Sequence, residues 1–494
     1  MISLPIKLRD ETLFSPDPVY RYPRNPVRIL RTDWRADLEF PLGEFHPETR
    51  VFPERDAEIV PDGDGFRFRA SRPGDWMLFH PDQPPVFVFL DDPTAWPVSA
   101  DAVRIPLKSD SPDNQAPILN EAMAKLSREG GGTLVVGPGV FRIGTLFMQS
   151  GVNLHLEAGA VLLASDNAED FPVEPEENVN RNLPRSLIPG ATRRLVLFQS
   201  VENAGIVGRG VISANGSAWR HRLMPGRRLM MNLMRLVNCK NIRIEGVELR
   251  DSEFWTVHAI LSERLRFDRV KLISEIPPKG WDRFQKADSQ SVWNNADGIN
   301  PDSSQDVEIL NCVFHTGDDC VPIKNTSTWR GELRDVRRIH VRGGLMRCST
   351  TACKIGTETL GGFMEDIVFE DIDIVQASRA FAADMKDGAT GRRLAFRNIR
   401  VHRCNRPFDF WIISREGQEN QTRFSRLEEI EVANVDFAVT GIEGANGECH
   451  LQGRGPAHNI TGVRFHGVSW EGHPFDPSLH PLMKINEFAE VILN

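Results

Sequence analysis

From Gly132 onward the chain repeats a unit of two short strands with alternating apolar residues, joined by Asn, Asp or Gly. Successive copies begin 23 to 42 residues apart, and the longer intervals contain an insertion or an extra coil. One unit cannot bury its apolar face alone, whereas stacked units can. The pattern therefore predicts an all-β protein with a right-handed parallel β-helix. The clearest copies are NIRIEGVEL (241–249), RLRFDRVKL (264–272), DVEILNCVF (306–314), RIHVRGGLM (338–346), DIVFEDIDI (366–374), RLAFRNIRV (393–401), EIEVANVDF (429–437) and GVRFHGVSW (462–470).

The first hundred residues have a different pattern, with short apolar or alternating runs separated by Pro, Gly and Asp. Such runs predict a small N-terminal antiparallel β-sandwich domain over residues 1–100. The β-helix domain is then expected over 101–494. The runs are VRIL (27–30), FRFRA (66–70), WMLFH (76–80) and VFVFLDD (86–92).

One helix is predicted, from Ala116 to Arg128, ahead of the first coil. Three successive glycines, Gly130 to Gly132, follow it and end it. We expect this helix to cover the open end of the solenoid, which would otherwise expose unpaired strand edges. Its apolar residues recur at helical spacing: Ile118, Leu119, Ala122, Met123 and Leu126.

Charge and composition exclude several classes of partner. The net charge of −9 argues against binding nucleic acid, which calls for a basic surface. No run of 18 apolar residues is present, so no membrane-spanning segment is expected. The N-terminus MISLPIKLRDETLF lacks the apolar region of a secretory signal, so a cytoplasmic protein is expected, or a secreted one if a leader precedes this sequence. The seven cysteines form no CxxC pair, which indicates neither metal ligands nor a disulfide framework.

The segment NADGINPDSSQDVEILNCVFHTGDDCVPIK contains three aspartates that point to chemistry. Asp297 and Asp318 are 21 residues apart, about one coil of a β-helix, and Asp319 follows directly. Neighbouring strands lie about 4.8 Å apart, so we expect the three carboxylates to share one solvent-reachable pocket. Such a cluster suits glycosidic hydrolysis, because repulsion keeps one carboxyl protonated while another activates water. Turn aspartates of a solenoid are the structural alternative.

Three segments in order resemble glycoside hydrolase family 28, the polygalacturonase family. They are GGTLVVGPGVFRIGTLFMQSGVNLHLEAGAVLLAS, CKNIRIEGVELRDSEFWTVHAILSERLRF and the aspartate segment above. The resemblance covers about residues 100–440, and family 49, the dextranases and isopullulanases, is a weaker match. It implies a β-helix hydrolase that inverts the anomeric carbon and needs no metal or other cofactor.

The resemblance also implies roles for single residues. The family's Asn-x-Asp motif falls on Asn295 and Asp297, and its Asp pair on Asp318 and Asp319. Asp318 would then be the general acid, while Asp297 and Asp319 would position and deprotonate the water. Two further residues match family positions. Lys324 would help to ionise two of the three acids, and His258 would either bond substrate or be a satisfied structural histidine.

Two positions depart from the family pattern. Where the family has a histidine before an Ile-Gly-Ser-type stretch, this chain has Thr350 or Thr351. Where the family reads Arg-Ile-Lys, whose two cations hold the galacturonate carboxylate, this chain reads Asp384-Met385-Lys386. A carboxylate in place of that arginine should repel a uronate, or could accept hydrogen bonds from neutral hydroxyls. Lys354 is either a replacement cation or an outward-pointing strand residue.

Three insertions, roughly 171–195, 216–233 and 276–294, are expected to build the binding face. Trp281 and Trp293, in the last one, are candidate sugar platforms. The insertions and the missing leader favour exo action on an oligosaccharide. A neutral, amino or rhamnose-containing sugar is as plausible as galacturonate. A lyase or epimerase and a non-catalytic glycan-binding module are the alternative classes, and the oligomeric state stays open.

Overall fold

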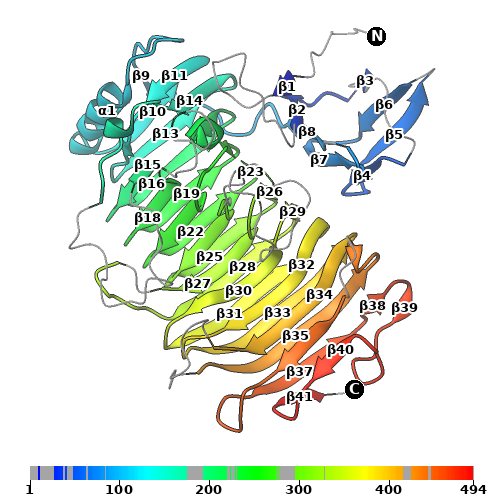
Figure 1. Ribbon diagram of the computed structural model, residues 1–494. Helices are drawn as coiled ribbons and strands as arrows, with labels where there is room; N and C mark the ends of the chain where they lie inside the picture. Colours follow the sequence, from blue (N-terminus) through cyan, green and yellow to red (C-terminus); the bar gives the residue numbers. More distant parts are fainter. Residues whose placement is uncertain are drawn as a thin grey trace. The chain divides into compact units, whose positions relative to one another are not determined.

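The computed structural model describes most of the chain (Figure 1). It divides into two compact units, Met1–Pro97 and Val98–Asn494. The described residues are 9–11, 27–36, 39–41, 48–62, 65–83, 85–174, 193–219, 223, 229, 231–274, 276, 295–326, 329–414, 424–442 and 447–492.

The N-terminal unit contains two sheets that share a hydrophobic core. Residues of both sheets, among them Phe68 and Trp76, pack together in that core. The predicted sandwich is therefore present, with one difference. Its pairs are antiparallel except for one pair, β2 with β8, which is parallel. In order across each sheet, the strands are β1 (Arg9–Glu11), β2 (Val27–Asp33), β8 (Val86–Asp91), β7 (Gly74–Phe79) and β4 (Arg50–Phe52), and β3 (Glu39–Pro41), β6 (Gly65–Ala70) and β5 (Ala57–Asp62).

The predicted helix is present as α1 (Ala116–Arg128), packed against the first coil. Leu119, Met123 and Leu126 are buried in the core that continues through the coils, whereas Ile118 is 46% exposed. The chain turns at Gly131, which has φ +104° and lies so close to the next coil that a Cβ would be 2.6 Å from a backbone oxygen. Only glycine fits there, which explains why the helix ends at this point.

The second unit is a parallel β-helix, as predicted, with three columns of stacked strands. The first column is β9 (Val103–Arg104), β10 (Gly132–Val136), β13 (Val152–Leu156), β16 (Glu202–Gly208), β19 (Lys240–Glu245), β22 (Glu263–Asp268), β25 (Gln305–Leu310), β28 (Val336–Arg342), β31 (Phe363–Glu370), β33 (Thr390–Val401), β35 (Arg426–Phe437), β37 (Ile460–His466) and β41 (Ala489–Ile492). The second is β11 (Gly139–Ile143), β14 (Ala160–Ala164), β17 (Val211–Ser213), β20 (Glu248–Arg250), β23 (Lys271–Ile273), β26 (Val313–Thr316) and β29 (Leu345–Cys348), which pairs with the start of β32 (Asp373–Met385).

The third column carries the candidate site. It contains β12 (Leu146–Phe147), β15 (Arg193–Gln199), β18 (Met231–Val237), β21 (Val257–Ile260), β24 (Ile299–Asp302), β27 (Val321–Asn325), β30 (Thr351–Thr359), the later part of β32, β34 (Cys404–Ile412), β36 (Cys449–Gln452) and β40 (Met483–Ile485). Every pairing along this column is parallel, so equivalent residues of successive coils lie side by side.

The last coils differ in one respect from the predicted two-strand unit. In β33 and β35 the two predicted strands run on as one, through Asn398 and Asn434, which have φ of 54° and 53°. Asparagine tolerates this left-handed backbone. The chain can therefore bend there without losing its ladder.

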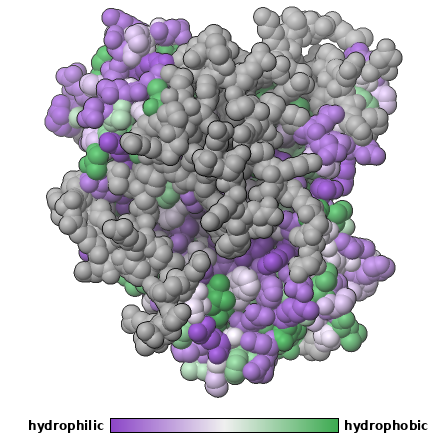
Figure 2. Space-filling view, viewed as in Figure 1, coloured by the Kyte–Doolittle hydropathy of each residue, from purple (hydrophilic) through white to green (hydrophobic). Residues whose placement is uncertain are grey.

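The interior of the solenoid is a continuous hydrophobic core, and all seven cysteines are buried in it. Cysteine behaves there as a small apolar residue. Among the residues that Figure 2 colours, hydrophilic ones predominate, with scattered hydrophobic ones between them. Within the described part of the chain, no helix has the length and apolar character needed to cross a bilayer.

Candidate active site

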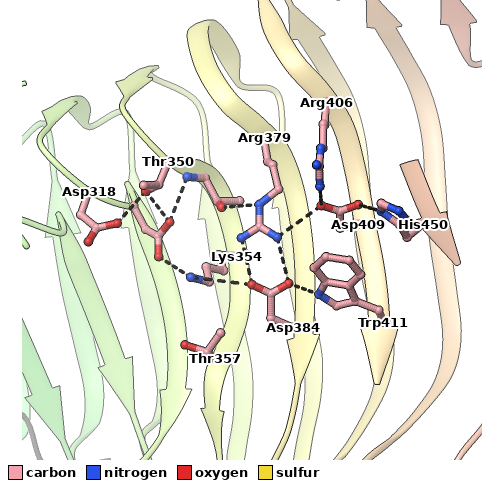
Figure 3. Close-up of polar contacts among 12 residues, drawn as sticks. Asp318, Thr350, Lys354, Thr357, Arg379, Asp384, Arg406, Asp409, Trp411 and His450 are labelled. Carbon is pink, nitrogen blue, oxygen red and sulfur yellow. Dashed lines mark hydrogen bonds and ion pairs between the residues drawn. The ribbon is translucent and has the colours of Figure 1, made fainter. Parts of the chain in front are cut away.

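Strands of the third column alternate their side chains between the core and the outer face. In β27, for example, Val321 and Ile323 enter the core, so Lys324 lies on the outer face. The same alternation in β30, β32, β34 and β36 produces a row of polar and aromatic side chains along one face of the solenoid (Figure 3). The members of this row are Lys324, Lys354, Asp384, Asp409, Trp411 and His450.

The three aspartates lie in the turns that lead into this column, on neighbouring coils. Asp297 precedes β24, and Asp318 and Asp319 precede β27. The Gly298 amide donates to the Asp319 carbonyl at 2.9 Å, which joins the two turns directly. A Cβ at Gly298 would be 2.3 Å from the Cys320 carbonyl oxygen, so this close approach requires glycine. The predicted placement on adjacent coils is therefore observed.

The three carboxyl groups are less accessible than the sequence suggested. Asp297, Asp318 and Asp319 are each only 2% exposed, although they lie outside the coil interior. A shared pocket that solvent can reach therefore stays a prediction. Their neighbours Asn295 and Thr350 are half-buried and reach the surface.

One threonine hydroxyl joins two of the acids. Thr350 Oγ1 lies 2.7 Å from Asp318 Oδ1 and 2.6 Å from Asp319 Oδ1. A hydroxyl has one hydrogen to donate, so it can donate to only one of two carboxylates. The other short contact requires that the carboxyl group itself supplies a proton. The geometry therefore accommodates one protonated and one ionised aspartate.

Asp319 has the surroundings of an ionised carboxylate. Besides Thr350, its Oδ1 accepts the Thr351 amide at 2.9 Å, and its Oδ2 accepts Lys354 Nζ at 2.7 Å. Burial alone would raise the pKa of Asp319, but the positive charges of Lys354 and Lys324 and these hydrogen bonds hold it well below its usual range. Lys354 thus points outward from β30, which is one of its two predicted positions, and its ammonium group contacts Asp319. Its role as a replacement cation for a substrate carboxylate stays a prediction.

Asp297 has the opposite tendency. Burial raises the pKa of Asp297 well above its usual range, Asp318 and Asp319 add to the rise, and Lys324 opposes it. Lys324 Nζ lies 3.5 Å from Asp297 Oδ2 and 3.0 Å from Glu358 Oε2. Burial would lower the pKa of Lys324, yet Glu358 and Asp297 together raise it above its usual value. The predicted contact of Lys324 with the acids is therefore present.

Asn295 and His258 differ in what they contact. Asn295 Nδ2 donates to Asp318 Oδ2 at 3.1 Å, so the family motif places it on the second oxygen of the acid. His258, in β21, is 1% exposed and bonds Asp302 through Nε2 at 2.9 Å. Burial lowers the pKa of His258 to about 4 against the opposing effect of Asp302. These contacts agree with the structural reading of His258.

Asp384 does not stand as an isolated negative charge. Arg379, earlier on β32, donates to both of its oxygens at 3.0 and 2.9 Å, and Trp411 Nε1 donates to Oδ1 at 2.5 Å (Figure 3). Lys354 Nζ lies 3.9 Å from Oδ2. Burial would raise the pKa of Asp384, but Arg379 and Lys354 lower it overall, so it is ionised and paired.

The pairing continues onto the next coils. Asp409 Oδ2 contacts Arg379 at 3.4 Å and Arg406 at 3.3 Å, and its Oδ1 lies 2.6 Å from His450 Nδ1. The His450 ring stacks on Trp411 with centroids 4.9 Å apart. Sequence reasoning missed the roles of Arg379, Asp409 and His450. Asp409 and His450 could have been predicted, because both point outward and occupy equivalent positions on β34 and β36. The sequence pattern gives no such indication for Arg379.

Three other predicted residues complete the account. Lys386 directly follows β32 and is half-buried, and its backbone amide donates to Thr359 Oγ1 at 2.9 Å. Trp281 and Trp293 lie outside the described residues, as do most of the insertions 171–195 and 276–294 and half of the insertion 216–233.

Comparison with known proteins agrees with this architecture. "Probable polygalacturonase" of Vitis vinifera is 23% identical over 363 residues, 71% of this chain and 70% of that protein. "Exo-poly-alpha-D-galacturonosidase" of Dickeya chrysanthemi is 26% identical over 216 residues, 38% of this chain and 35% of that protein. A family 28 exopolygalacturonase of Yersinia enterocolitica has the same fold, with a TM-score of 0.57, 16% identity and coverage of 89% of this chain and 87% of that one.

An exopolygalacturonase of Thermotoga maritima also shares the fold, with a TM-score of 0.60, 19% identity and coverage of 80% and 91%. The model of the family "Glycosyl hydrolases family 28" matches residues 186–474, which is more than half of the chain and includes every aspartate discussed above. This polygalacturonase-like protein therefore belongs to glycosyl hydrolase family 28, whose members hydrolyse O-glycosyl bonds.

Proposed function

We propose that this enzyme hydrolyses the glycosidic bond of an oligosaccharide with inversion at the anomeric carbon. Asp318 acts as the general acid, and Asp297 and Asp319 position and deprotonate the attacking water. In this step Asp318 gives its proton to the leaving oxygen as the C–O bond breaks. The water bonds to the anomeric carbon from the opposite face and gives its proton to the carboxylates.

The observation that carries the proposal is the bridge through Thr350. Asp319 accepts hydrogen bonds from Thr351 and Lys354, so it is the ionised member of the bridged pair. We assign the proton of the bridge to Asp318, whose Oδ1 lies 2.7 Å from Thr350 Oγ1 and whose Oδ2 accepts from Asn295. In this assignment Asp318 holds a proton before any substrate arrives, as a general acid must.

The contacts support Asp319 more strongly than Asp297 as the group that accepts a proton from the water. Asp319 is held ionised by Lys354 and can accept a proton from water. Burial raises the pKa of Asp297, so Lys324 has to hold it ionised for it to share that role. The two acids bridged by Thr350 are close together, and carboxyl groups about 5–5.5 Å apart are typical of retaining enzymes, whereas about 6.5–9.5 Å is typical of inverting ones. The configuration of the product is therefore the sharpest test.

Exo action is part of the proposal. Solved structures with the same fold include two named as exopolygalacturonases. The long insertions of this sequence, at 171–195, 216–233 and 276–294, are of the kind that closes one end of a binding site. Release of monosaccharide or disaccharide from one chain end, without mid-chain cleavage, is the expected product pattern.

The test begins with a panel of defined uronic and neutral oligosaccharides, with proton NMR of the first product. We expect the freshly released sugar to have the configuration opposite to that of the cleaved bond. Retention would contradict the water-activating role of Asp297 and Asp319.

Asp318→Asn should lower kcat by roughly 10²–10⁴-fold and leave the fold intact. Asp306→Asn, near the start of β25 in the first column, is the matched control and should keep wild-type activity. If Asp318→Asn turned over substrate at the wild-type rate, the assignment of the acid would be wrong.

A further inference from the structure

The cations next to the triad are already paired with carboxylates of the protein. Lys324 contacts Asp297 and Glu358, and Lys354 contacts Asp319. Each lysine is at most 3% exposed. A sugar carboxylate would have to compete with buried protein carboxylates for these two ammonium groups.

Arg379 is engaged in the same way on the following coil. Its two terminal nitrogens bond Asp384, one of them also contacts Asp409, and its Nε donates to the Thr351 hydroxyl at 3.1 Å. A guanidinium binds a ligand carboxylate best through two parallel N–H groups. Here Asp384 occupies that pair of donors.

The cations beside the triad already have carboxylate partners. Asp319 pairs with Lys354, Asp384 with Arg379, and Asp409 with Arg379 and Arg406, which makes three carboxylates for three cations. A uronate that approaches this row would add a fourth negative charge, and like charges at a buried contact disfavour binding strongly. It also finds the guanidinium fork of Arg379 occupied by Asp384.

Uncharged groups find better contacts there. Trp411 is half-buried, its indole N–H is fixed on Asp384, and one face of its ring is stacked on His450. An indole held rigid in this way offers apolar surface to the C–H groups of a sugar ring. The hydroxyl of Thr350, which is half-buried and reaches the surface, can also exchange a hydrogen bond with a sugar hydroxyl.

We propose that the sugar unit which binds over β30, β32 and β34 is uncharged, and that Asp384, with Arg379 as its counter-ion, excludes a uronate from that position. The inference rests on the proposed hydrolysis, because it names the class of sugar next to the catalytic acids. Asp384 is the specificity determinant, and Arg379 acts through it as a positioning residue.

The first test compares two ligands that differ only at C6. Asp318→Asn, which does not consume substrate, is titrated by calorimetry with α-1,4-linked galactotriose and with α-1,4-linked trigalacturonate. We expect the neutral trisaccharide to bind at least about tenfold more tightly. Equal or tighter binding of trigalacturonate, or no binding of either ligand, would overturn the inference.

The second test removes the carboxylate that pairs with the Arg379 guanidinium. Asp384→Asn, made in the Asp318→Asn background, removes the charge that holds Arg379 and keeps the shape of the side chain. We expect the affinity for trigalacturonate to rise about tenfold, because Arg379 can then pair with the ligand carboxylate. Adding Arg379→Gln should abolish that gain, and Lys125→Ala, on the exposed side of α1, should leave the ligand preference unchanged.

These outcomes separate the two proposals. If Asp384→Asn fails to fold, the comparison of the two ligands still decides, because it needs no change at Asp384. A wild-type enzyme that cleaves trigalacturonate with inversion and prefers it to galactotriose would refute the inference and leave the proposed hydrolysis standing. A wild-type preference for the neutral ligand with no hydrolysis of any glycan would do the reverse.

Discussion

A single hydroxyl group, that of Thr350, connects two of the three aspartates in the candidate active site. Thr350 Oγ1 contacts both Asp318 and Asp319, while Lys354 and Thr351 keep Asp319 ionised. Under the proposed roles, these contacts form a chain from a protonated Asp318 through Thr350 to an ionised Asp319. Both acids are equally buried, so in this proposal the contacts, and not the exposure of the side chains, decide which acid holds the proton.

The Thr350 bridge leads to a prediction with a matched pair of variants. Thr350→Val keeps the shape but removes the hydroxyl, so both acids lose a hydrogen bond and the proton is no longer confined to Asp318. We expect kcat to fall by roughly 10²-fold, with a shifted acidic limb in the pH profile. Thr350→Ser keeps the hydroxyl and should retain most of the activity. Equal rates for the two variants would show that the methyl group, not the proton chain, is what matters at this position.

The sequence predicted the site residues that belong to a recognisable motif. It did not predict residues such as Arg379, which only the path of the folded chain brings to the site. Asp297, Asp318, Asp319, Asn295 and Lys324 could be placed because coil length and motif order agree with the observed stacking. The pairing of Arg379 with Asp384 could not be predicted from alternation. The two residues are an odd number of positions apart on β32, so a regular strand would send them to opposite faces.

The reason lies in the path of β32. This strand begins in the second column, shows a register irregularity opposite Met346 and Arg347, and then enters the third column. Alternation fails where a strand turns such a corner, and Arg379 lies just beyond it. From the sequence, Asp384 is therefore expected to be an unpaired negative charge, because the strand pattern does not indicate that Arg379 would pair with it.

At the scale of the elements, one position recurs near the start of each strand of the first column. It has a left-handed backbone in eight successive coils, with φ between 53° and 57°. Strand pairing places these residues directly above one another. They are Asn203, Asn241, Arg264, Asp306, Arg338, Asp366, Arg393 and Glu429.

Neighbours in this ladder hydrogen-bond or ion-pair along the solenoid. Asn241 donates to Asn203 at 2.6 Å, and Arg338 and Arg393 pair with Asp306 and Asp366. The pairs are exposed, and such ion pairs contribute little, about 0.2–1 kcal/mol each. The left-handed backbone carries the larger cost for a residue with a Cβ, about 1–2 kcal/mol.

The ladder therefore predicts an order of stability for two variants of Asp306. Asp306→Ala and Asp306→Gly both remove the ion pair with Arg338, and only alanine keeps a Cβ on the left-handed backbone. We expect the glycine variant to be more stable than the alanine variant by about 0.5–1 kcal/mol, after glycine's higher unfolded-state entropy is subtracted. Urea unfolding of both variants measures this difference. A more stable alanine variant would mean that the local backbone relaxes when the aspartate is lost.

At the scale of the whole solenoid, each coil is stabilised by the coils on either side. Aromatic rings dominate the interior of the later coils, where Phe396 stacks on Phe369, Phe381 and Phe410 with centroids 5.5, 4.7 and 5.6 Å apart. Phe381 and Phe410 lie on β32 and β34, the strands that present Asp384 and Asp409 on the outer face. The core of these coils thus supports the polar row directly.

This arrangement predicts that damage to the core stays local. Phe396→Ala removes a fully buried ring and should lower the free energy of unfolding by about 3–5 kcal/mol. Because a solenoid is held mainly by contacts between adjacent coils, hydrogen exchange should speed up in β31, β33 and β35 and stay slow in β13 and β16. Phe147→Ala is the matched control, since Phe147 is 39% exposed and its loss should change little.

The same experiment separates the two parts of the candidate site. The polar row around Asp384 rests on the coils next to Phe396, whereas Asp297 lies on an earlier coil, before β24. If coils loosen locally, Phe396→Ala should reduce discrimination between galactotriose and trigalacturonate more than it reduces kcat. Acceleration of exchange throughout the solenoid, with equal loss of both properties, would mean that the coils unfold as one cooperative unit. The fold would then couple ligand choice and chemistry through its entire core.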